Sequence, residues 1–324
     1  MKEQPSRKSN YQQEDLSKVK RYSIKERMSK VRSDALAESV QAGSSFADFY
    51  RSLPSFLAAK DLKELVRHII NARRNNKPVI LMMGAHVIKV GLSPVIIDLM
   101  KAEIITCIAL NGAGIIHDSE MCLFGQTSED VAVGLSDGSF GMALETGHFI
   151  NSAIADGQKD NLGLGECIGK GLIESASPDA LQRSILATAY ALHIPVTVHV
   201  AVGTDIVHQH PDADGAAIGA CSFRDFKILA AHVAEMNCGA VAINVGSNVI
   251  LPEVFLKALT VARNIHGEVA NFYTANFDMI QHYRPRVNVV QRPTATGGKG
   301  YQFTGHHEIM LPLLAAAIKE AMPA

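Results

Sequence analysis

The sequence IITCIALNGAGIIHDSE, residues 104–120, is the stretch that decides the fold. It begins with an apolar run of the length of one strand, continues into Asn-Gly-Ala-Gly at 111–114, and then carries acidic side chains and a histidine. An uninterrupted apolar run is typical of a parallel strand buried on both faces, and glycine lets a ligand approach the backbone because it has no Cβ. The stretch predicts a buried strand whose carboxyl end opens into a ligand crevice, although glycine after a strand is equally common as plain turn chemistry.

The composition indicates a globular α/β protein. The 324 residues are 47% hydrophobic and 19% charged, which is enough apolar material for one large core. A formal net charge of -1 argues against nonspecific binding of nucleic acid. No apolar run reaches the ~18 residues of a membrane span, and the polar, basic start lacks the apolar segment of a secretory signal, so we expect a cytoplasmic protein without a membrane partner.

The five cysteines are widely spaced and include no CxxC pair. Disulfides and a cysteine zinc site are therefore not expected.

The chain divides into an N-terminal arm, residues 1–45, and one expected α/β domain, residues 46–324. The arm is basic and poor in apolar residues, with its cations at Lys18, Lys20, Arg21, Lys25, Arg27, Lys30 and Arg32. It is interpreted either as a solvated tail or as a segment that touches an acidic partner or a neighbouring subunit.

Five strand-like segments alternate with helical patterns in the expected domain. They lie at residues 78–83, 105–110, 195–200, 240–245 and 269–273, and nearly every one stops at Gly, Ser, Thr, Asn or His. Strand, helix, strand succession implies right-handed parallel crossovers, so we predict a doubly wound parallel sheet of the Rossmann-like kind. Residues 120–192 form a mostly helical insertion, in which glycines at 163, 165, 169 and 171 predict close helix packing.

The loop 199–214 is dense in histidine and aspartate. His208 and His210, together with Asp205, Asp212 and Asp214, are candidate ligands of a divalent metal, because imidazole and carboxylate suit zinc, manganese or iron. A hydrated turn is the other interpretation of the same composition.

A second cluster contains His117, Asp118, Glu145 and His148. Glu145 and His148 are three residues apart and share a helical face, so the carboxylate is placed to orient the imidazole as a general base. An interior histidine beside a surface carboxylate explains the pair equally well.

The C-terminal region has two glycine-rich segments. Residues 296–300 carry Lys299 but lack the spacing of a phosphate-binding P-loop. Residues 305–308, Gly-His-His-Glu, precede a helix whose amino end could hold an anion, and a plain turn accounts for them as well.

Several strand-end motifs occur in a recognisable order. They are Gly84-Ala85-His86, Asn111-Gly112-Ala113-Gly114, His193-Ile194-Pro195-Val196, Gly203-Thr204-Asp205-Ile206, Val245-Gly246-Ser247-Asn248 and Tyr273-Thr274-Ala275. In this succession, over residues 77–308, the sequence resembles the deoxyhypusine synthase family. That family binds NAD in a Rossmann-like crevice shared between subunits of a tetramer, oxidises spermidine, and moves the aminobutyl group through an imine on a lysine to a protein lysine.

The resemblance implies roles for particular residues. It implies NAD contacts at Gly84, Gly112, Ala113, Gly114, Asp118, Gly246, Ser247, Thr274 and Ala275. Asp205 and His208 would face the amine. The family's tryptophan-containing lysine motif has no counterpart, since the chain has no tryptophan, and Lys299 is the only nearby lysine.

We therefore expect an NAD-dependent enzyme that oxidises a polyamine or related amine, with aminoalkyl transfer as a second step that needs Lys299. Asp205 or Glu145 would hold the cation, and His148 or His117 would accept a proton. By resemblance we expect a homo-oligomer, a tetramer, with shared active sites. The alternatives are a metal-dependent hydrolase that uses His208, His210, Asp212 and Asp214, and a non-catalytic nucleotide-binding homologue.

Overall fold

The computed structural model describes residues 10–322 and contains a six-stranded, wholly parallel sheet. The strands are β1 (Val79–Met83), β2 (Cys107–Asn111), β3 (Val196–His199), β4 (Val241–Val245), β5 (Phe272–Asp278) and β6 (Gly298–Thr304). Their order across the sheet is β3-β2-β1-β4-β5-β6, so the chain winds outward from β1 in one direction and from β4 in the other. This is the strand order of dinucleotide-binding folds, and the predicted doubly wound α/β class is confirmed.

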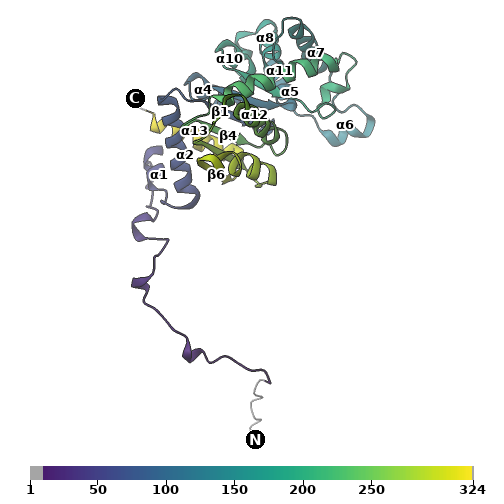
Figure 1. The fold of residues 1–324 in the computed structure, drawn as a ribbon. Helices are drawn as coiled ribbons and strands as arrows, with labels where there is room; N and C mark the ends of the chain where they lie inside the picture. Colours follow the sequence, from purple (N-terminus) through teal and green to yellow (C-terminus); the bar gives the residue numbers. More distant parts are fainter. Residues whose placement is uncertain (1–9, 323–324) are drawn as a thin grey trace.

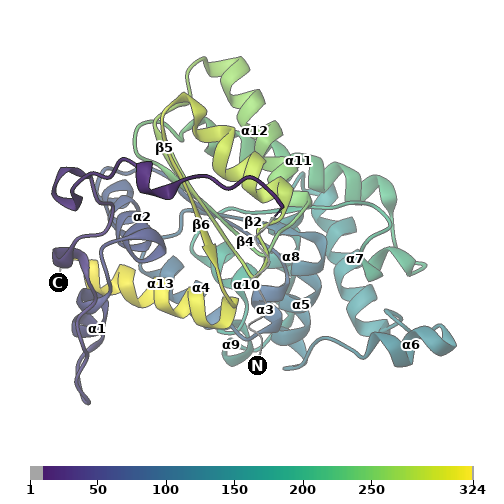
Figure 2. The same cartoon turned by 90° about the horizontal axis from the view of Figure 1, so that it is seen from below.

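Helices cover both faces of the sheet (Figures 1 and 2). In chain order they are α1 (Phe46–Ser52), α2 (Leu57–Arg74), α3 (His86–Lys89), α4 (Ser93–Lys101), α5 (Gly112–Leu123), α6 (Val131–Asp137), α7 (Leu144–Lys159), α8 (Leu164–Ser175), α9 (Pro178–Leu181), α10 (Ile185–Ala191), α11 (Gly215–Ala234), α12 (Ile250–His266) and α13 (His307–Ala321). Short turns of helix lie at η4 (Ile206–Gln209) and η5 (Pro285–Gln291).

Two apolar cores form because successive side chains of a strand point to opposite faces. In β1, Leu81 and Met83 pack with α2, α4 and α13, whereas Ile80 and Met82 pack with α11 and α12. All five residues of β1 are buried, which explains why its sequence is continuously apolar and not alternating.

The helical insertion between β2 and β3 is present, and its glycines serve packing as expected. A Cβ on Gly165 would lie 1.8 Å from the carbonyl oxygen of Val196, and one on Gly169 would lie 2.8 Å from the Cβ of Tyr190. Only glycine allows α8 to approach the backbone of β3 and the side of α10 this closely.

The outer edge of β3 is closed by a buried carboxylate. Asp225 of α11 is fully buried, and its Oδ2 accepts hydrogen bonds from the backbone N–H groups of Gly165 at 3.0 Å and Val198 at 2.7 Å. Burial raises the pKa of Asp225 to about 8, although these hydrogen bonds act to lower it. The carboxylate thus satisfies donors that would otherwise remain unpaired at the edge of the sheet.

The C-terminal strands correct two expectations. β5 runs to Asp278, five residues beyond the expected end at Tyr273, so Thr274 and Ala275 lie inside the strand. β6 occupies the segment expected to be a glycine-rich loop, because Tyr301 and Phe303 alternate with exposed residues and bury their rings against the sheet. Glycine at 298 and 300 concealed this strand pattern in the sequence.

Residues 10–34 are exposed almost throughout and extend away from the body of the protein (Figure 1). The first α-helix begins at Phe46, where Ser45 and Asp48 form a capping box. None of the helices within residues 10–322 is long and apolar enough to cross a lipid bilayer.

Candidate functional site

Two glycines meet at the point where the strand order reverses. Gly84 follows β1 and Gly246 follows the neighbouring β4; the N–H of Gly84 donates to the carbonyl of Val245 at 2.9 Å. A Cβ on Gly84 would lie 2.4 Å from the carbonyl oxygen of Gly246, and Gly246 has a φ of 64°, which favours glycine. In sheets of this kind ligands bind beyond the carboxyl ends of the strands at the reversal, which we call the switch point.

Four of the buried polar atoms without a hydrogen-bond partner lie at the end of the sheet that carries the switch point. They are Nδ1 of His307, Oδ2 of Asp278, Oδ1 of Asn111 and Oδ1 of Asn248. Each belongs to a residue at, or shortly after, the carboxyl end of a strand. Buried polar groups in folded proteins are nearly always paired, so this set indicates a place where a polar ligand completes the hydrogen bonding.

His307 is the most enclosed of these groups. It is 4% exposed, and its ring covers Gly246 so closely that a Cβ there would lie 2.5 Å from Cε1. The Nε2 lies 3.3 Å from the carbonyl oxygen of Phe277, which makes Nε2 the protonated nitrogen and Nδ1 a free acceptor. Burial lowers the pKa of His307, so the ring is a neutral base, and the exposed ring of His86 lies edge-on at 5.7 Å.

Asp278 is the last residue of β5. This strand completes a unit in which β4 is followed by the Gly246 turn, then by α12, and then by β5. The Oδ1 of Asp278 accepts a hydrogen bond from the N–H of Met279 at 2.8 Å, and its buried Oδ2 is free. An acidic side chain at the end of the second strand of such a unit is where dinucleotide folds bind ribose hydroxyls. Sequence reasoning missed Asp278 because the strand was expected to end at Tyr273.

Asp205 occupies the amino end of α5. A Cβ on Gly112 would lie 1.9 Å from its Oδ2, and burial raises the pKa of the Asp205 carboxyl. The Nδ1 of His208 accepts a hydrogen bond from the N–H of Gly203 at 3.1 Å, so His208 holds the turn that carries Asp205. A carboxylate of the protein therefore faces the helix end at which the cofactor was expected, while Gly114 packs on Leu110.

Asp118 has a structural role in place of the expected cofactor contact. It is fully buried, and its carboxylate accepts hydrogen bonds from Ser184 Oγ at 2.5 Å, from the N–H of Ile185 at 2.8 Å and from the N–H of Leu186 at 3.1 Å. These partners are the first residues of α10 and its cap, so Asp118 anchors that helix to α5. Burial raises its pKa to about 6.

Thr274 and Ala275 are also displaced from the expected site. Both are fully buried within β5, and Thr274 pairs in register with Ala242 of β4 and Gly300 of β6. Thr274 lies four positions before Asp278, the last residue of the strand, a distance of ~13 Å at the rise of a β-strand. Neither residue reaches the carboxyl edge of the sheet.

Lys299 lies at the opposite edge of the sheet from the switch point. It is the second residue of β6, five residues or ~17 Å from the carboxyl end at Thr304. Its Nζ forms ion pairs with Asp61 at 2.8 Å and Glu64 at 2.7 Å. Burial acts to lower its pKa, but the hydrogen bonds to the two carboxylates outweigh it, so the pKa is raised and the amine is unsuited to imine formation.

Glu145 and His148 do not form the expected pair. The partner of His148 is Asp212, with Nδ1 and Oδ2 3.0 Å apart at an exposed position. Glu145 and His148 line a cavity of about 450 Å³ between α7 and α8, away from the strand ends.

His117 belongs to a separate hydrogen-bond network on α5. Its Nδ1 lies 2.6 Å from Thr127 Oγ1, which in turn donates to Glu120 at 2.5 Å. Burial lowers the pKa of His117. This histidine is half-buried, and its hydrogen-bond network extends to Thr127 and Glu120.

The side chains of the 205–214 loop point to different partners. Nε2 of His210 lies 2.8 Å from the carbonyl of Gly141, Asp212 pairs with His148, and Asp214 caps α11. Among residues 10–322, no three His, Cys, Asp or Glu side chains come close enough together to hold a metal ion. The expected metal cluster is therefore not assembled.

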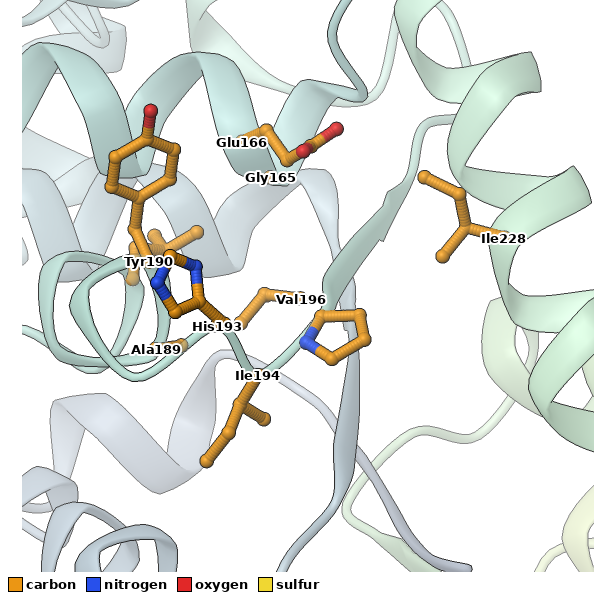
Figure 3. A pocket seen from close by; sticks show the side chains of 10 residues that line it. Gly165, Glu166, Ala189, Tyr190, His193, Ile194, Val196 and Ile228 are labelled. Carbon is orange, nitrogen blue, oxygen red and sulfur yellow. The ribbon is translucent and has the colours of Figure 1, made fainter.

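A cavity of about 400 Å³ lies at the amino end of β3, the opposite end of the sheet from the strand ends of the switch point (Figure 3). Tyr190, His193 and Glu166 line it together with apolar side chains such as Ile194 and Ile228. None of the expected site residues contributes to it.

Solved structures resemble this chain in fold. A candidate deoxyhypusine synthase from Entamoeba histolytica matches with a TM-score of 0.53 at 10% identity, over 88% of this chain and 96% of that one. A conserved candidate LOR/SDH protein from Methanococcus maripaludis S2 matches with a TM-score of 0.50 at 15% identity, over 81% and 69% of the two chains. Unliganded AgrE has a TM-score of 0.51 at 15% identity, over 81% of this chain and 33% of AgrE.

No protein-family model and no curated protein matches the sequence. At these identities the likeness establishes a structural relationship to the deoxyhypusine synthase and LOR/SDH folds and does not establish membership of either family. The chain spans only a third of the length of AgrE.

Proposed function

We propose that this protein is an NAD-dependent enzyme that oxidises an amine at the switch point. The observation that carries the proposal is the contact between Gly84 and Gly246, with unpartnered polar atoms of His307 and Asp278 beside it. Two glycine turns at the strand reversal suit a pyrophosphate, and a free buried carboxylate oxygen suits a ribose hydroxyl.

The turns after β1 and β4 would hold the dinucleotide. Gly84 leads into α3, and Gly246 leads into α12, whose start is fixed by Ser247 Oγ accepting the N–H of Leu251 at 3.2 Å. Asp278 would bind the ribose hydroxyls through its free Oδ2. When bound, NAD supplies a hydride acceptor.

Asp205 would hold the amine as a cation. Its carboxyl is buried with a raised pKa, which means that the surroundings supply too little positive charge to stabilise the ionised form. An ammonium group brought next to Asp205 supplies that charge. The neighbouring His208 accepts a hydrogen bond from the N–H of Gly203 and so stabilises the turn that positions the Asp205 carboxylate.

His307 would take the proton that amine oxidation releases. Its Nδ1 is an unpartnered acceptor, and its lowered pKa keeps it neutral and ready to accept a proton near neutral pH. The nearby ring of His86, exposed on its outer side, gives the proton a route to solvent.

One of the compared structures supports the choice of ligands. AgrE has been solved as a ternary complex with ornithine and NAD+, an amine and a dinucleotide, and that structure matches this chain with a TM-score of 0.50 at 14% identity. Transfer of an aminoalkyl group to a second amine is not part of the proposal, because Lys299 lies at the far edge of the sheet.

The test is reduction of NAD by the purified protein with spermidine, ornithine and short diamines offered in turn. NADH formation with one amine, abolished in Asp205→Asn and retained in Lys299→Gln, is the expected result. Stoichiometric NAD binding without reduction by any amine would favour the alternative of a non-catalytic nucleotide-binding protein. Absence of NAD binding would overturn both. We also propose a homo-oligomer with shared sites, which light scattering on the same sample checks.

A further inference from the structure

A basic pocket lies between α1 and α2, apart from the switch point. It has a volume of about 430 Å³, and its polar lining consists of Tyr50, Arg51, Lys63, Arg67, Asn71 and Arg74. No acidic side chain lines it, although the whole chain has a net charge of only -1. The positive charge is therefore concentrated locally and is not a property of the entire surface.

The polar residues of α2 in this pocket form one stripe. Lys63, Arg67, Asn71 and Arg74 follow each other at intervals of four, four and three residues, which places them on the same face of the helix. The stripe spans eleven residues, ~16 Å along the helix axis. Val66 and Ile70 form the apolar floor beside it.

Two of the arginines are uncommitted. Arg51 pairs with Asp48, and Lys63 donates from Nζ to the carbonyl oxygen of Leu53 at 2.7 Å. Arg67 and Arg74 have no carboxylate within ion-pair distance among residues 10–322. Their guanidinium groups are free to bind a ligand in the bidentate manner that suits phosphate.

Tyr50 provides an independent sign of a missing ligand. Its hydroxyl is buried and has no hydrogen-bond partner, and Nζ of Lys63 lies 5.9 Å from the centre of its ring. Burial raises the pKa of Tyr50 to about 12, so the hydroxyl remains protonated and can donate. Because Tyr50 lines the pocket, an oxyanion bound there is a candidate acceptor for this hydroxyl as well as for the arginines.

We propose that this pocket binds a small molecule bearing a phosphate or diphosphate group. Two free guanidinium groups, an ammonium group and a buried hydroxyl donor match the several acceptors and double negative charge of phosphate better than the single charge of a carboxylate. Arg67 and Asn71 also line an adjoining cavity of about 250 Å³ with Lys77 and Tyr273, which gives room for the rest of the ligand. Lys77 precedes β1 and Tyr273 lies near the start of β5, so the phosphate site and the switch point are at opposite ends of the sheet.

The test is calorimetric titration of the full-length protein with inorganic phosphate and with pyrophosphate, at an ionic strength held constant with chloride. Saturable binding of one pyrophosphate is expected, weakened about tenfold, or ~1.4 kcal/mol, in each of Arg67→Gln and Arg74→Gln. Tyr50→Phe should weaken binding about threefold at an unchanged melting temperature, because it removes only the unpartnered hydroxyl. Arg286→Gln is the matched control, since Arg286 is exposed on η5 outside the pocket.

Gly246→Ala separates this site from the switch point, because pyrophosphate bound at the proposed NAD site would be lost in that variant and pyrophosphate bound by α2 would be kept. The proposal is overturned if phosphate binds no better than chloride, or if the Arg67, Arg74 and Tyr50 variants all titrate like the wild type. It is equally overturned if Gly246→Ala alone abolishes binding.

Discussion

Gly84 and Gly246 are in backbone contact across the reversal of the sheet, with space for no side chain between them: a Cβ on Gly84 would lie 2.4 Å from the carbonyl oxygen of Gly246. The two residues directly follow the adjacent parallel strands β1 and β4, whose connections run in opposite directions. The contact therefore brings two glycine turns together at the position where a doubly wound sheet binds its ligand.

Gly84→Ala should lose NAD binding and some stability. The added methyl group must push the turn after β1 away from β4, at a cost of about 1–3 kcal/mol typical of overpacked sites. Urea denaturation and NAD titration measure the two effects. Gly219→Ala is the control, because a Cβ at this exposed helical glycine meets nothing within 4 Å and should raise stability by ~0.5–1 kcal/mol. Equal NAD affinity in Gly84→Ala and wild type would place the cofactor elsewhere.

Asp278→Asn should weaken NAD binding about tenfold and reduce the preference for NAD over NADP. The carboxylate accepts hydrogen bonds from ribose hydroxyls and repels a 2′-phosphate. The uncharged amide of asparagine accepts those hydrogen bonds more weakly and does not repel the phosphate. Affinities for both cofactors, measured on wild type and variant, give the answer. Unchanged ratios would show that Oδ2 of Asp278 does not face the ribose.

His307 should make the protein less stable at mildly acidic pH. Its pKa in the folded protein is lowered by burial, so below the ordinary value of 6.5 the unfolded chain takes up a proton that the folded chain refuses. Stability is complete above pH 6.5 and declines as the pH falls toward the folded value. Replacement by Asn removes this contribution, and urea midpoints between pH 5 and pH 7.5 should vary less in His307→Asn. Parallel pH profiles in both proteins would contradict the assignment.

Asp225 should act in the opposite direction. Its folded pKa of about 8 lies above the ordinary 3.8, so stability declines as the pH rises through that window, because only the unfolded chain releases the proton freely. Asp225→Asn cannot ionise, and its unfolding free energy relative to wild type should rise between pH 5 and pH 8, by roughly 1 kcal/mol or more. Asp225→Ala is expected to lose about 2–5 kcal/mol at either pH, because the N–H groups of Gly165 and Val198 lose their acceptor.

Lys299→Gln should leave catalysis unchanged within a few-fold. The side chain pairs with Asp61 and Glu64 of α2, so its loss affects the attachment of that helix and not the switch point. Turnover reports an effect at the switch point and melting temperature reports an effect on the attachment of α2, so both are measured on the same variant. A covalent adduct on Lys299, trapped by borohydride during amine oxidation, would restore the imine mechanism that the structure argues against.

The sequence was sufficient for the architecture because the buried strands carry a strong signal. β1 is an uninterrupted apolar run, and β2 and β4 are buried segments that are apolar except for one asparagine each. The strand-helix alternation then leaves few topologies. β6 gave no such run, since it is an edge strand in which only Tyr301 and Phe303 are buried and glycines interrupt the pattern. Because β6 was not predicted, Lys299 was expected on an active-site loop, whereas it is the second residue of a strand.

The candidate site was less predictable because the partners of its side chains are set by the tertiary structure and not by the local sequence. Gly84, Gly246 and Asp205 were expected at the site from the family resemblance of the strand-end motifs. His307 and Asp278 were not, because they depended on knowing where β5 and β6 end. Asp118 caps a helix whose first contact, Ser184, lies 66 residues further along the chain. Nothing in the sequence distinguishes Asp118 from a ligand-binding acid. The histidines of the 205–214 loop likewise turn to separate partners that local spacing does not reveal.

The most direct measurement is calorimetric titration of the wild-type protein and Gly246→Ala with NAD, each in the presence and absence of spermidine. The account predicts micromolar binding of NAD to the wild type, tighter when the amine is present, and loss of that binding in Gly246→Ala, whose new Cβ would meet the ring of His307 at 2.5 Å. No heat of binding in the wild type, or the same affinity in the folded variant, would contradict the assignment of a dinucleotide site to the switch point.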